Sequence, residues 1–214
     1  MDVLKITIMP VGILGTNCYL LSSGEKNCAV IDPGGQADKI KAQLEERGLT
    51  PRMILLTHGH HDHFGGLKKL LEYFPVPFYI GKDDAEMLTD DERNRAHFWG
   101  LKPEEYHIEG VTPLEDGQEL MLDELTIKVM NTPGHTKGGV CYLVGDVIFS
   151  GDTLFRDDIG RCDLYGGDFA VMRQSLQKLR DLPGDYTVYP GHGDSTELAR
   201  ERQYNHYMKE LSAL

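Results

Sequence analysis

The feature that most constrains this chain is the short run Thr57–His63, which places four histidines and one aspartate directly after the apolar residues 53–56. Zinc and similar divalent ions are held by neutral imidazole nitrogen and by carboxylate oxygen, and catalytic sites leave one coordination position open for water. The run therefore predicts metal-activated water at the end of a buried strand.

Three further candidate ligands come later in the chain, each after an apolar segment and a glycine. They are His135 after Gly134, Asp152 after Gly151, and His192 after Gly191. Glycine lets the backbone turn sharply and approach a metal closely. We expect these three segment ends to converge beside the first run.

The candidate ligands are too many for one tetrahedral ion and suit two ions that share a ligand. A carboxylate has two oxygens and can bridge two metals, which makes Asp152 the natural bridge. The remaining residues divide into two sets, with His58, His60 and His135 assigned to the first ion and Asp62, His63 and His192 to the second.

Two such ions, about 3.5–4 Å apart, can lower the pKa of a bound water toward about 7 and polarise a carbonyl group. We expect Asp62 and Asp152 to be the catalytic residues of this hydrolytic centre. The cofactor is expected to be two divalent ions, zinc in the first place, with iron and manganese as alternatives.

Two residues near the ligands are expected to support them. Asp32 is either a turn residue or an acceptor for a ligand imidazole, and the two roles are compatible. His61 lies between ligands on a tight loop, so its side chain is expected to point away and to have a structural or supporting role.

The order of apolar segments predicts an α/β fold of four layers, helix, sheet, sheet, helix, with two mixed sheets. Short strands are expected at 4–9, 18–21 and 28–31 as an antiparallel meander, and later at 53–56, 76–80, 125–130, 139–143, 147–150 and 186–189. Helices are expected at 37–48, 65–74, 169–182 and 196–211, and His58–His63 is expected as a loop.

Residues 82–112 interrupt this rhythm with acidic pairs and aromatic side chains, and we interpret them as a short helical insertion in a single domain, 1–214. Phe98 and Trp99 in this segment are candidates for an apolar wall over the substrate. The alternative is that they pack a small core of the insertion itself.

Composition limits the partners. Lys plus Arg is 22 and Asp plus Glu is 34, and the resulting formal charge of −12 makes a nucleic-acid partner unexpected. No apolar stretch approaches the roughly 20 residues that span a bilayer, and the first residues do not resemble a signal peptide. We expect a cytoplasmic protein without a membrane partner, and the sequence does not indicate its oligomeric state.

The run Thr57–His63, followed by His135, Asp152 and His192 in this order, resembles the metallo-β-lactamase superfamily over nearly the whole chain. Residues 132–138, 150–155 and 159–161 are similar to segments of glyoxalase II and its shorter bacterial relatives. Those enzymes hydrolyse thioesters, typically S-lactoylglutathione. The resemblance therefore implies a metal-dependent hydrolase of a small thioester, and Asp152 argues against a true zinc β-lactamase.

Two departures from glyoxalase II bear on the substrate. That enzyme has an additional C-terminal helical domain whose basic residues hold glutathione, and this chain ends at Leu214 without it, so glutathione is not implied. Arg161 matches a basic substrate-contacting position of the family, but Asp163 replaces a nearby tyrosine. Arg161 is thus expected either to anchor a substrate carboxylate or to form a surface ion pair.

Other functions fit the same ligands. Residues 161–163 also resemble the persulfide dioxygenases, which use one iron held by two histidines and an aspartate, whereas residues 191–196 look more like the hydrolases. Hydrolysis of a lactone or another ester on the same fold is a further alternative. Thioester hydrolysis is the favoured function.

Overall fold

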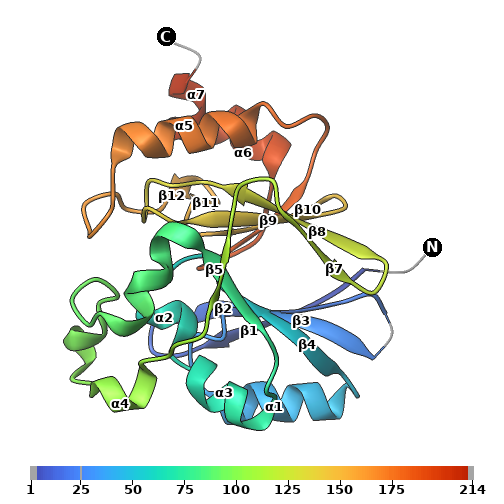
Figure 1. The fold of residues 1–214 in the computed structure, drawn as a ribbon. Coiled ribbons are helices and arrows are strands. Elements are labelled where there is room, and N and C mark those ends of the chain that lie inside the picture. Colours follow the sequence, from blue (N-terminus) through green and yellow to red (C-terminus); the bar gives the residue numbers. More distant parts are fainter. Residues whose placement is uncertain (1–3, 25, 212–214) are drawn as a thin grey trace.

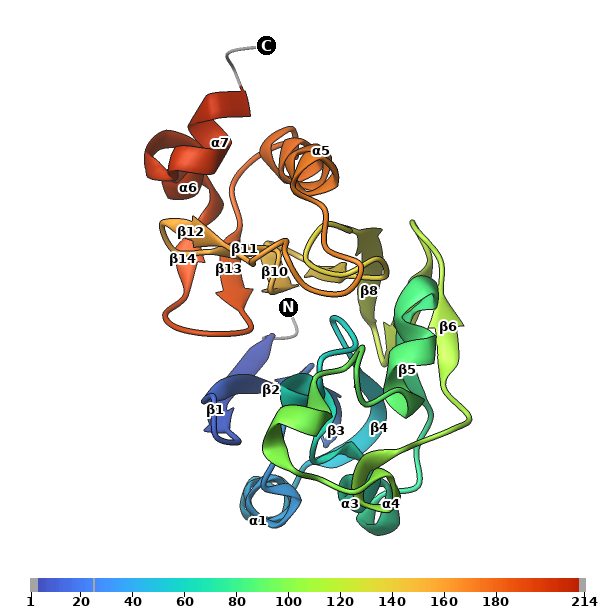
Figure 2. The ribbon, with the colours of Figure 1, turned by 90° about the vertical axis from the view of Figure 1, so that its left-hand side faces the viewer.

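The computed structural model describes residues 4–24 and 26–211 and arranges them in four layers, with helices outside and two sheets inside (Figure 1). In the turned view of Figure 2, α1 and α3 lie outside the first sheet, and α5, α6 and α7 lie outside the second. These helices are α1 (Ala37–Glu46), α3 (Leu67–Tyr73), α5 (Phe169–Arg180), α6 (Leu198–Tyr204) and α7 (His206–Glu210).

The first sheet has the strand order β1-β2-β3-β4-β5-β6. Its strands are β1 (Lys5–Val11), β2 (Thr16–Ser22), β3 (Asn27–Ile31), β4 (Thr50–Leu55), β5 (Phe78–Gly81) and β6 (Thr112–Leu114). The first three strands form the expected antiparallel meander, and the pairs from β3 to β6 are parallel. The sheet is therefore mixed, as predicted.

The second sheet has the order β14-β13-β10-β9-β8-β7. Its strands are β7 (Glu119–Leu122), β8 (Leu125–Asn131), β9 (Val140–Val144), β10 (Val147–Gly151), β13 (Thr187–Pro190) and β14 (Thr196–Glu197). Among the described strands of this sheet, only β10 and β13 pair in parallel. A separate hairpin is formed by β11 (Leu154–Phe155) and β12 (Asp158–Ile159). The predicted four-layer sandwich with two mixed sheets is confirmed.

The alternation of side chains along β2 shows how the layers are joined. Cys18 and Leu20 pack in the cluster beneath α1 and α3, whereas Tyr19 and Leu21 pack between the two sheets. Successive side chains of a strand point to opposite faces, so a strand that is apolar at every position belongs between two covering layers. A third cluster fills the space between the second sheet and α5, α6 and α7.

Several predicted elements differ from the structure. Strands β6 and β7 and the β11–β12 hairpin were not predicted, because they are short and mostly not buried. The expected loop His58–His63 is helical in its second half, as part of α2 (His61–Phe64). The expected insertion contains η1 (Lys82–Thr89), η2 (Ala96–Trp99) and α4 (Pro103–Tyr106).

The expected final helix 196–211 is also wrong in its extent. Its first two residues are strand β14, which pairs with β13, and Asn205 separates α6 from α7. The Asn205 backbone is extended there, and its side chain accepts a hydrogen bond from the Tyr207 amide as the cap of α7.

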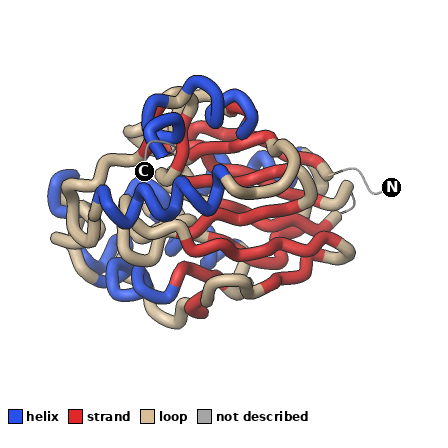
Figure 3. Tube along the Cα trace, turned by 90° about the horizontal axis from the view of Figure 1, so that it is seen from above, coloured by secondary structure: helices blue, strands red, loops and turns tan. Residues whose placement is uncertain are grey.

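The ends of the strands determine where a site can form. Seen from above, strands fill the side of the molecule that carries the N-terminus, and loops and short helices gather at the opposite side (Figure 3). The carboxyl ends of β4, β8, β10 and β13 lead directly into the candidate ligands. Ligands in open α/β sheets bind at such carboxyl ends.

The packing between the sheets gives a stability prediction. Phe149 is fully buried there, with its ring centroid 5.1 Å from that of Tyr19 and 5.7 Å from that of Tyr189. Replacing it with alanine should lower the free energy of unfolding by about 3–5 kcal/mol, because it leaves a cavity in the core. Urea denaturation with excess chelator measures this change without a contribution from bound metal.

Met121→Ala is the matched control, since the Met121 side chain on β7 is 57% exposed. This variant should change the free energy of unfolding by less than about 0.5 kcal/mol. A loss below about 1 kcal/mol for Phe149→Ala would contradict the assignment of this ring to the core between the sheets.

Candidate metal centre

Four segments from the two sheets meet at one place. Atoms that can bind a metal lie within 4.8 Å of one another in three overlapping groups. These groups are His58, His60 and His135; His58, His63 and Asp152; and Asp62, His63 and His192. All seven candidate ligands of the sequence analysis are thus brought together.

Unpartnered buried atoms test whether these residues fit a divalent metal. The Nε2 atoms of His58, His60 and His63 and Oδ1 of Asp152 are buried and make no hydrogen bond within the described part of the chain. Buried polar atoms without a partner are costly, and imidazole and carboxylate donors are those that zinc, iron and manganese accept. The donor set fits divalent metal ions.

Asp152 lies between the two expected ligand sets. Its Oδ1 is 3.4 Å from Nε2 of His63, and its Oδ2 is 3.5 Å from Nε2 of His135 and 3.7 Å from Nε2 of His192. The carboxylate therefore faces both ligand sets: Oδ2 lies near one histidine of each set, and Oδ1 lies near His63 of the second set. This position agrees with the expected bridge, and the ligand role itself stays a prediction.

Asp32 holds His63 in place from behind. Its carboxylate is buried, lies 2.9 Å from Nδ1 of His63, and accepts hydrogen bonds from the amide and the hydroxyl of Thr57. With Nδ1 engaged, Nε2 of His63 faces Asp62 and Asp152. This contact corresponds to the expected supporting role, because a carboxylate behind an imidazole fixes its orientation and tautomer.

Asp84 is a buried residue that the sequence analysis missed. Its carboxylate accepts hydrogen bonds from the Gly59 amide at 3.0 Å, the Thr136 hydroxyl at 2.6 Å and the Gly138 amide at 2.6 Å. It thereby joins the ligand loop of the first sheet to the ligand loop of the second. The pair Asp83-Asp84 falls in the expected helical insertion, and nothing in the sequence indicates that the second aspartate is buried.

His135 and the loop of His192 are positioned through contacts with backbone carbonyls. Nδ1 of His135 is 2.7 Å from the carbonyl oxygen of Arg161. The loop that carries His192 is held by the Asn17 side chain, which donates to the carbonyls of Pro190 and Gly193. Each contact leaves Nε2 of the histidine facing a carboxylate of the centre.

Gly191 shows how closely the segments approach. A Cβ atom at this position would lie 2.2 Å from Oδ1 of Asp152 and 2.6 Å from Cε1 of His63. Any larger residue would push these groups apart. The glycine before His192 therefore provides space for the centre, in agreement with the close approach expected from the sequence.

In the metal-free centre, pKa values of histidines shift in opposite directions in the two ligand sets. Burial lowers the pKa of His58 and of His60 well below the usual value, so both are neutral and can bind metal. Burial also acts against the charged form of His63, but the carboxylates of Asp62, Asp152 and Asp32 outweigh it and raise the pKa of His63 to about 10.

Asp62 is the counterpart of these histidines. Burial acts to raise the pKa of Asp62, but the charges of His63 and His192 and a hydrogen bond with His192 lower it well below the usual value. The carboxylate also accepts a hydrogen bond from the Thr16 hydroxyl at 3.1 Å. Asp62 is therefore ionised near neutral pH, as a metal ligand must be.

A cavity of about 350 Å³ opens onto the centre, and we call it the metal pocket. Its lining comprises Leu14, His60, Asp62, Arg95, Phe98, Trp99, His135, Asp152, Arg161, Leu164 and His192. None of these described residues carries a hydroxyl or a thiol. The pocket therefore offers no side chain of the serine or cysteine type for covalent catalysis.

The three residues expected to contact substrate all line this pocket. Phe98 and Trp99 are 60% and 38% exposed, so they do not form the core of the insertion, and contact with substrate stays a prediction. Arg161 forms a two-point ion pair with Asp163, at 2.7 Å for each contact. The structure thus shows the surface ion pair that was the alternative to a carboxylate anchor.

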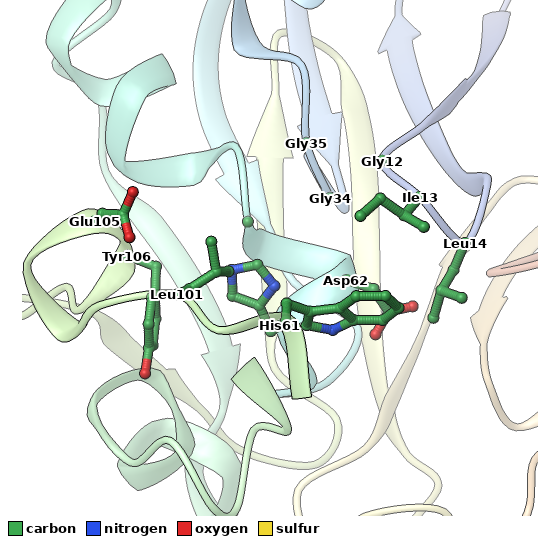
Figure 4. Close-up of a pocket in the computed structure, with 12 residues that line it drawn as sticks. Gly12, Ile13, Leu14, Gly34, Gly35, His61, Asp62, Leu101, Glu105 and Tyr106 are labelled. Atoms are coloured by element: carbon green, nitrogen blue, oxygen red, sulfur yellow. The ribbon is translucent and has the colours of Figure 1, made fainter. Parts of the chain in front are cut away.

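A second cavity of about 380 Å³ adjoins the metal pocket and shares Leu14, Asp62 and Trp99 with it. Figure 4 shows His61 between Leu101 and Asp62 in this cavity, with Ile13 and Leu14 on the far side of Asp62. We call it the apolar pocket.

His61 belongs to the apolar pocket and not to the three ligand groups. Its ring packs edge-on against those of Phe64 and Tyr106, with centroids 5.4 Å and 5.1 Å away. It therefore points away from the centre, in agreement with the structural role expected from its place on the loop.

Comparison with models of known protein families identifies the family of this chain. The model of the metallo-beta-lactamase superfamily matches residues 11–192, and the chain belongs to this family. The matched range includes all seven candidate ligands. It also includes strands of both sheets and helices from both outer layers.

Two relatives show how the chain lies within the family. It is 38% identical over 212 residues to a probable metallo-hydrolase, YqgX, of Bacillus subtilis, covering 95% of this chain and 97% of the relative. It is 32% identical to the hydroxyacylglutathione hydrolase GloC of Haemophilus influenzae, covering 98% of this chain and 100% of the relative. Its homologues thus include metallo-hydrolases and glyoxalase II-type enzymes.

Two solved structures are similar along almost their whole length. The BLEG-1 B3 metallo-beta-lactamase is 33% identical with a TM-score of 0.89, covering 95% of this chain and 99% of the other. TTHA1623 in a di-iron-bound form is 35% identical with a TM-score of 0.83, covering 94% and 99%. Among the described residues, no helix has the length and apolar character of a membrane span.

Asp32 gives the first prediction for this centre. Asp32→Asn keeps a residue that tolerates the left-handed backbone at φ 49° but removes the negative charge behind His63. The affinity for zinc should fall about 10- to 100-fold, as for other losses behind a ligand imidazole. Competition with a chelating dye measures it. Asp146→Asn, at an exposed position, is the control, and equal affinity in the two variants would contradict the role of Asp32.

Protonation of His63 gives the second prediction. With its pKa raised to about 10, His63 is protonated in the metal-free protein at neutral pH, and a metal must displace that proton. Zinc affinity should therefore rise with pH, by up to about tenfold per unit between pH 6.5 and 8.5, with release of about one proton from His63. Calorimetry in buffers of different ionisation enthalpy counts the released protons, and an affinity that does not change with pH would be inconsistent with this assignment.

Proposed function

We propose that this chain is a dinuclear-metal hydrolase of a small thioester, similar to glyoxalase II. The observation that carries the proposal is the meeting of two sets of metal-binding side chains around Asp152, in a pocket whose described lining has no hydroxyl or thiol. With its carboxylates and imidazoles proposed as metal ligands, such a pocket suits an enzyme that obtains its nucleophile from water.

When bound, two metal ions supply a water molecule of lowered pKa and an electrophile for the carbonyl oxygen. We propose His58, His60 and His135 as one set of ligands, Asp62, His63 and His192 as the other, and Asp152 as the shared carboxylate. Zinc is our first expectation for the ions. Iron is supported by the di-iron form of TTHA1623, and manganese fits the same donors.

Contacts with neighbouring residues orient the proposed ligand side chains of this centre. Asp32 fixes the ring of His63, and Thr16 binds one oxygen of the ionised Asp62. Because these groups are already oriented, little reorganisation is needed when charge develops on the substrate carbonyl.

The leaving group explains why a thioester suits this pocket. A thiol has a pKa near 8.5, so it departs as a thiolate with little help from a general acid. The metal pocket contains no lysine, tyrosine or cysteine among the described residues that could serve as such an acid. An amide, whose leaving amine must be protonated, would be a poorer match.

The size of the two pockets supports a small-molecule substrate. The metal pocket of about 350 Å³ and the apolar pocket of about 380 Å³ adjoin at Asp62. Sites for small ligands commonly have volumes of about 300–1,000 Å³. The hydroxyacylglutathione hydrolase of Haemophilus influenzae, matched over the full length, supports an acyl-thiol.

A second candidate function is hydrolysis of a β-lactam. The similarity to a structure described as a B3 metallo-beta-lactamase favours it, at 33% identity over nearly the whole chain. The position of Asp152 between the two ligand sets is our argument for the thioester, since the sequence resemblance implies that the best-known β-lactamases lack an aspartate there.

The test uses one purified sample for four measurements. We expect close to two metal ions per chain, hydrolysis of S-lactoylglutathione or of S-lactoyl-N-acetylcysteamine, no oxygen uptake with a persulfide, and slower turnover of nitrocefin. Removing the metal with a chelator should reduce thioester hydrolysis by at least about a hundredfold, and adding zinc, iron or manganese should restore it.

Each alternative predicts a different result. Oxygen uptake with about one iron per chain and no thioester cleavage would replace the proposal with a persulfide dioxygenase. Turnover of nitrocefin well above that of any thioester would favour the β-lactamase. Cleavage of lactones alone would assign another ester hydrolase.

A further inference from the structure

Two arginines line the metal pocket, and their surroundings differ. The guanidinium of Arg161 is engaged by both oxygens of Asp163. Arg95 is partly buried, and its side chain makes no ion pair or hydrogen bond with any residue of 4–24 or 26–211. Arg95 therefore presents unused N–H donors to the pocket.

The backbone on either side of Arg95 is attached to the metal-ligand loop. The carbonyl of the fully buried Asn94 accepts a hydrogen bond from the His61 amide at 2.8 Å. The Asn94 side chain donates to the Met87 carbonyl at 2.7 Å and accepts from the Ala96 amide at 2.9 Å. These contacts hold Arg95 in a defined position relative to His60 and Asp62.

The conformation of Arg95 is also unusual. Its backbone is left-handed, with φ 71° and ψ 9°, which few residues other than glycine, asparagine and aspartate adopt. Its guanidinium carbon lies 4.0 Å from the centroid of the Phe98 ring, which forms part of the same pocket wall. Such stacking restricts the guanidinium plane and leaves its edge available for hydrogen bonds.

The nearby Arg93 shows the contrast within the same loop. Arg93 pairs with Glu86 and with Asp90 and stacks on the Tyr165 ring, and it lines neither pocket. Arg95, by contrast, lines the metal pocket and forms no ion pair among the described residues. Its charge contributes to lowering the pKa of Asp163, but the carboxylate of Asp163 is engaged by Arg161. A planar guanidinium binds a carboxylate best, through two parallel hydrogen bonds.

We propose that Arg95 binds a carboxylate of the thioester substrate and so selects anionic thioesters over uncharged ones. The proposal rests on the proposed thioester hydrolysis and replaces Arg161 with Arg95 as the anchor. The carboxylate belongs to the thiol part or to the acyl part of the substrate, and the pocket chemistry is the same for both.

Kinetics with three thioesters test this role. S-lactoylglutathione carries carboxylates on the thiol part, S-succinyl-N-acetylcysteamine carries one on the acyl part, and S-lactoyl-N-acetylcysteamine carries none. Arg95→Gln should raise KM about 10- to 100-fold for a carboxylated substrate, the loss expected for a charged hydrogen-bonded pair, and change kcat little. The KM for the uncharged thioester should change by less than about threefold. Which of the two carboxylated substrates shows the raised KM identifies the part that carries the carboxylate.

Two further variants separate binding from structure and from net charge. Arg95→Lys keeps the charge without the two-point geometry, so its KM for the carboxylated substrate should lie between the values of wild type and Arg95→Gln. Arg93→Gln removes the same charge two residues away and should leave all three KM values within about threefold. An equal loss for charged and uncharged thioesters in Arg95→Gln, or a larger loss of anionic selectivity in Arg161→Gln, would overturn the proposal.

Equilibrium binding keeps this test separate from the proposed function. The probes are the thioether S-methylglutathione, which cannot be hydrolysed, and its diethyl ester, whose carboxylates are masked. S-(3-carboxypropyl)-N-acetylcysteamine and its ethyl ester are the matching probes for a carboxylate on the acyl part. For at least one of the two pairs, zinc-loaded wild type should bind the acid at least about tenfold more tightly than the ester, and Arg95→Gln should abolish the difference. Failure of thioester hydrolysis alone refutes the proposed function, whereas equal binding of acid and ester by wild type in both pairs refutes the role of Arg95.

Discussion

The buried carboxylate of Asp84 joins the two halves of this protein at the place where the chemistry is proposed. It binds the Gly59 amide from the first sheet and the Thr136 and Gly138 groups from the second. Burial raises the pKa of Asp84, and the three hydrogen bonds act against that rise. Since each sheet supplies only part of the metal-binding set, the centre depends on this registration of one loop against the other.

The protonation states of the residues in the centre follow from burial and from neighbouring charges. His58 and His60 are neutral because they are buried, whereas His63 is held between carboxylates and keeps a proton until a metal replaces it. A cluster of carboxylates without cations would be costly, and bound metal offsets that cost. The close packing of carboxylates around His63 thus accounts for the orientation of this ligand, for the ionisation of Asp62 and for the expected affinity for metal.

Much of this could be predicted from local patterns. Apolar segments of strand length gave the sandwich, and a glycine before His135, Asp152 and His192 marked segment ends that do meet. Short edge strands such as β6 and β7 could not be predicted, because their side chains are mostly not buried and carry little hydrophobic pattern. The expected last helix starts later in the structure because its first two residues pair with β13 as strand β14, and helical periodicity in the sequence does not indicate such a pairing.

The sequence by itself determined the family, the layers and the types of side chain available for metal. Only the tertiary structure decided which polar groups are engaged and which are free. Arg161 and Arg95 look equivalent as residues, yet Arg161 is paired with Asp163, whereas Arg95 stacks on Phe98 and forms no ion pair among the described residues. The physical reason is that pairing and burial depend on the conformation that folding gives each segment. Asp163 lies only two residues from Arg161, but the sequence does not show that these two side chains meet while that of Arg95 finds no such partner.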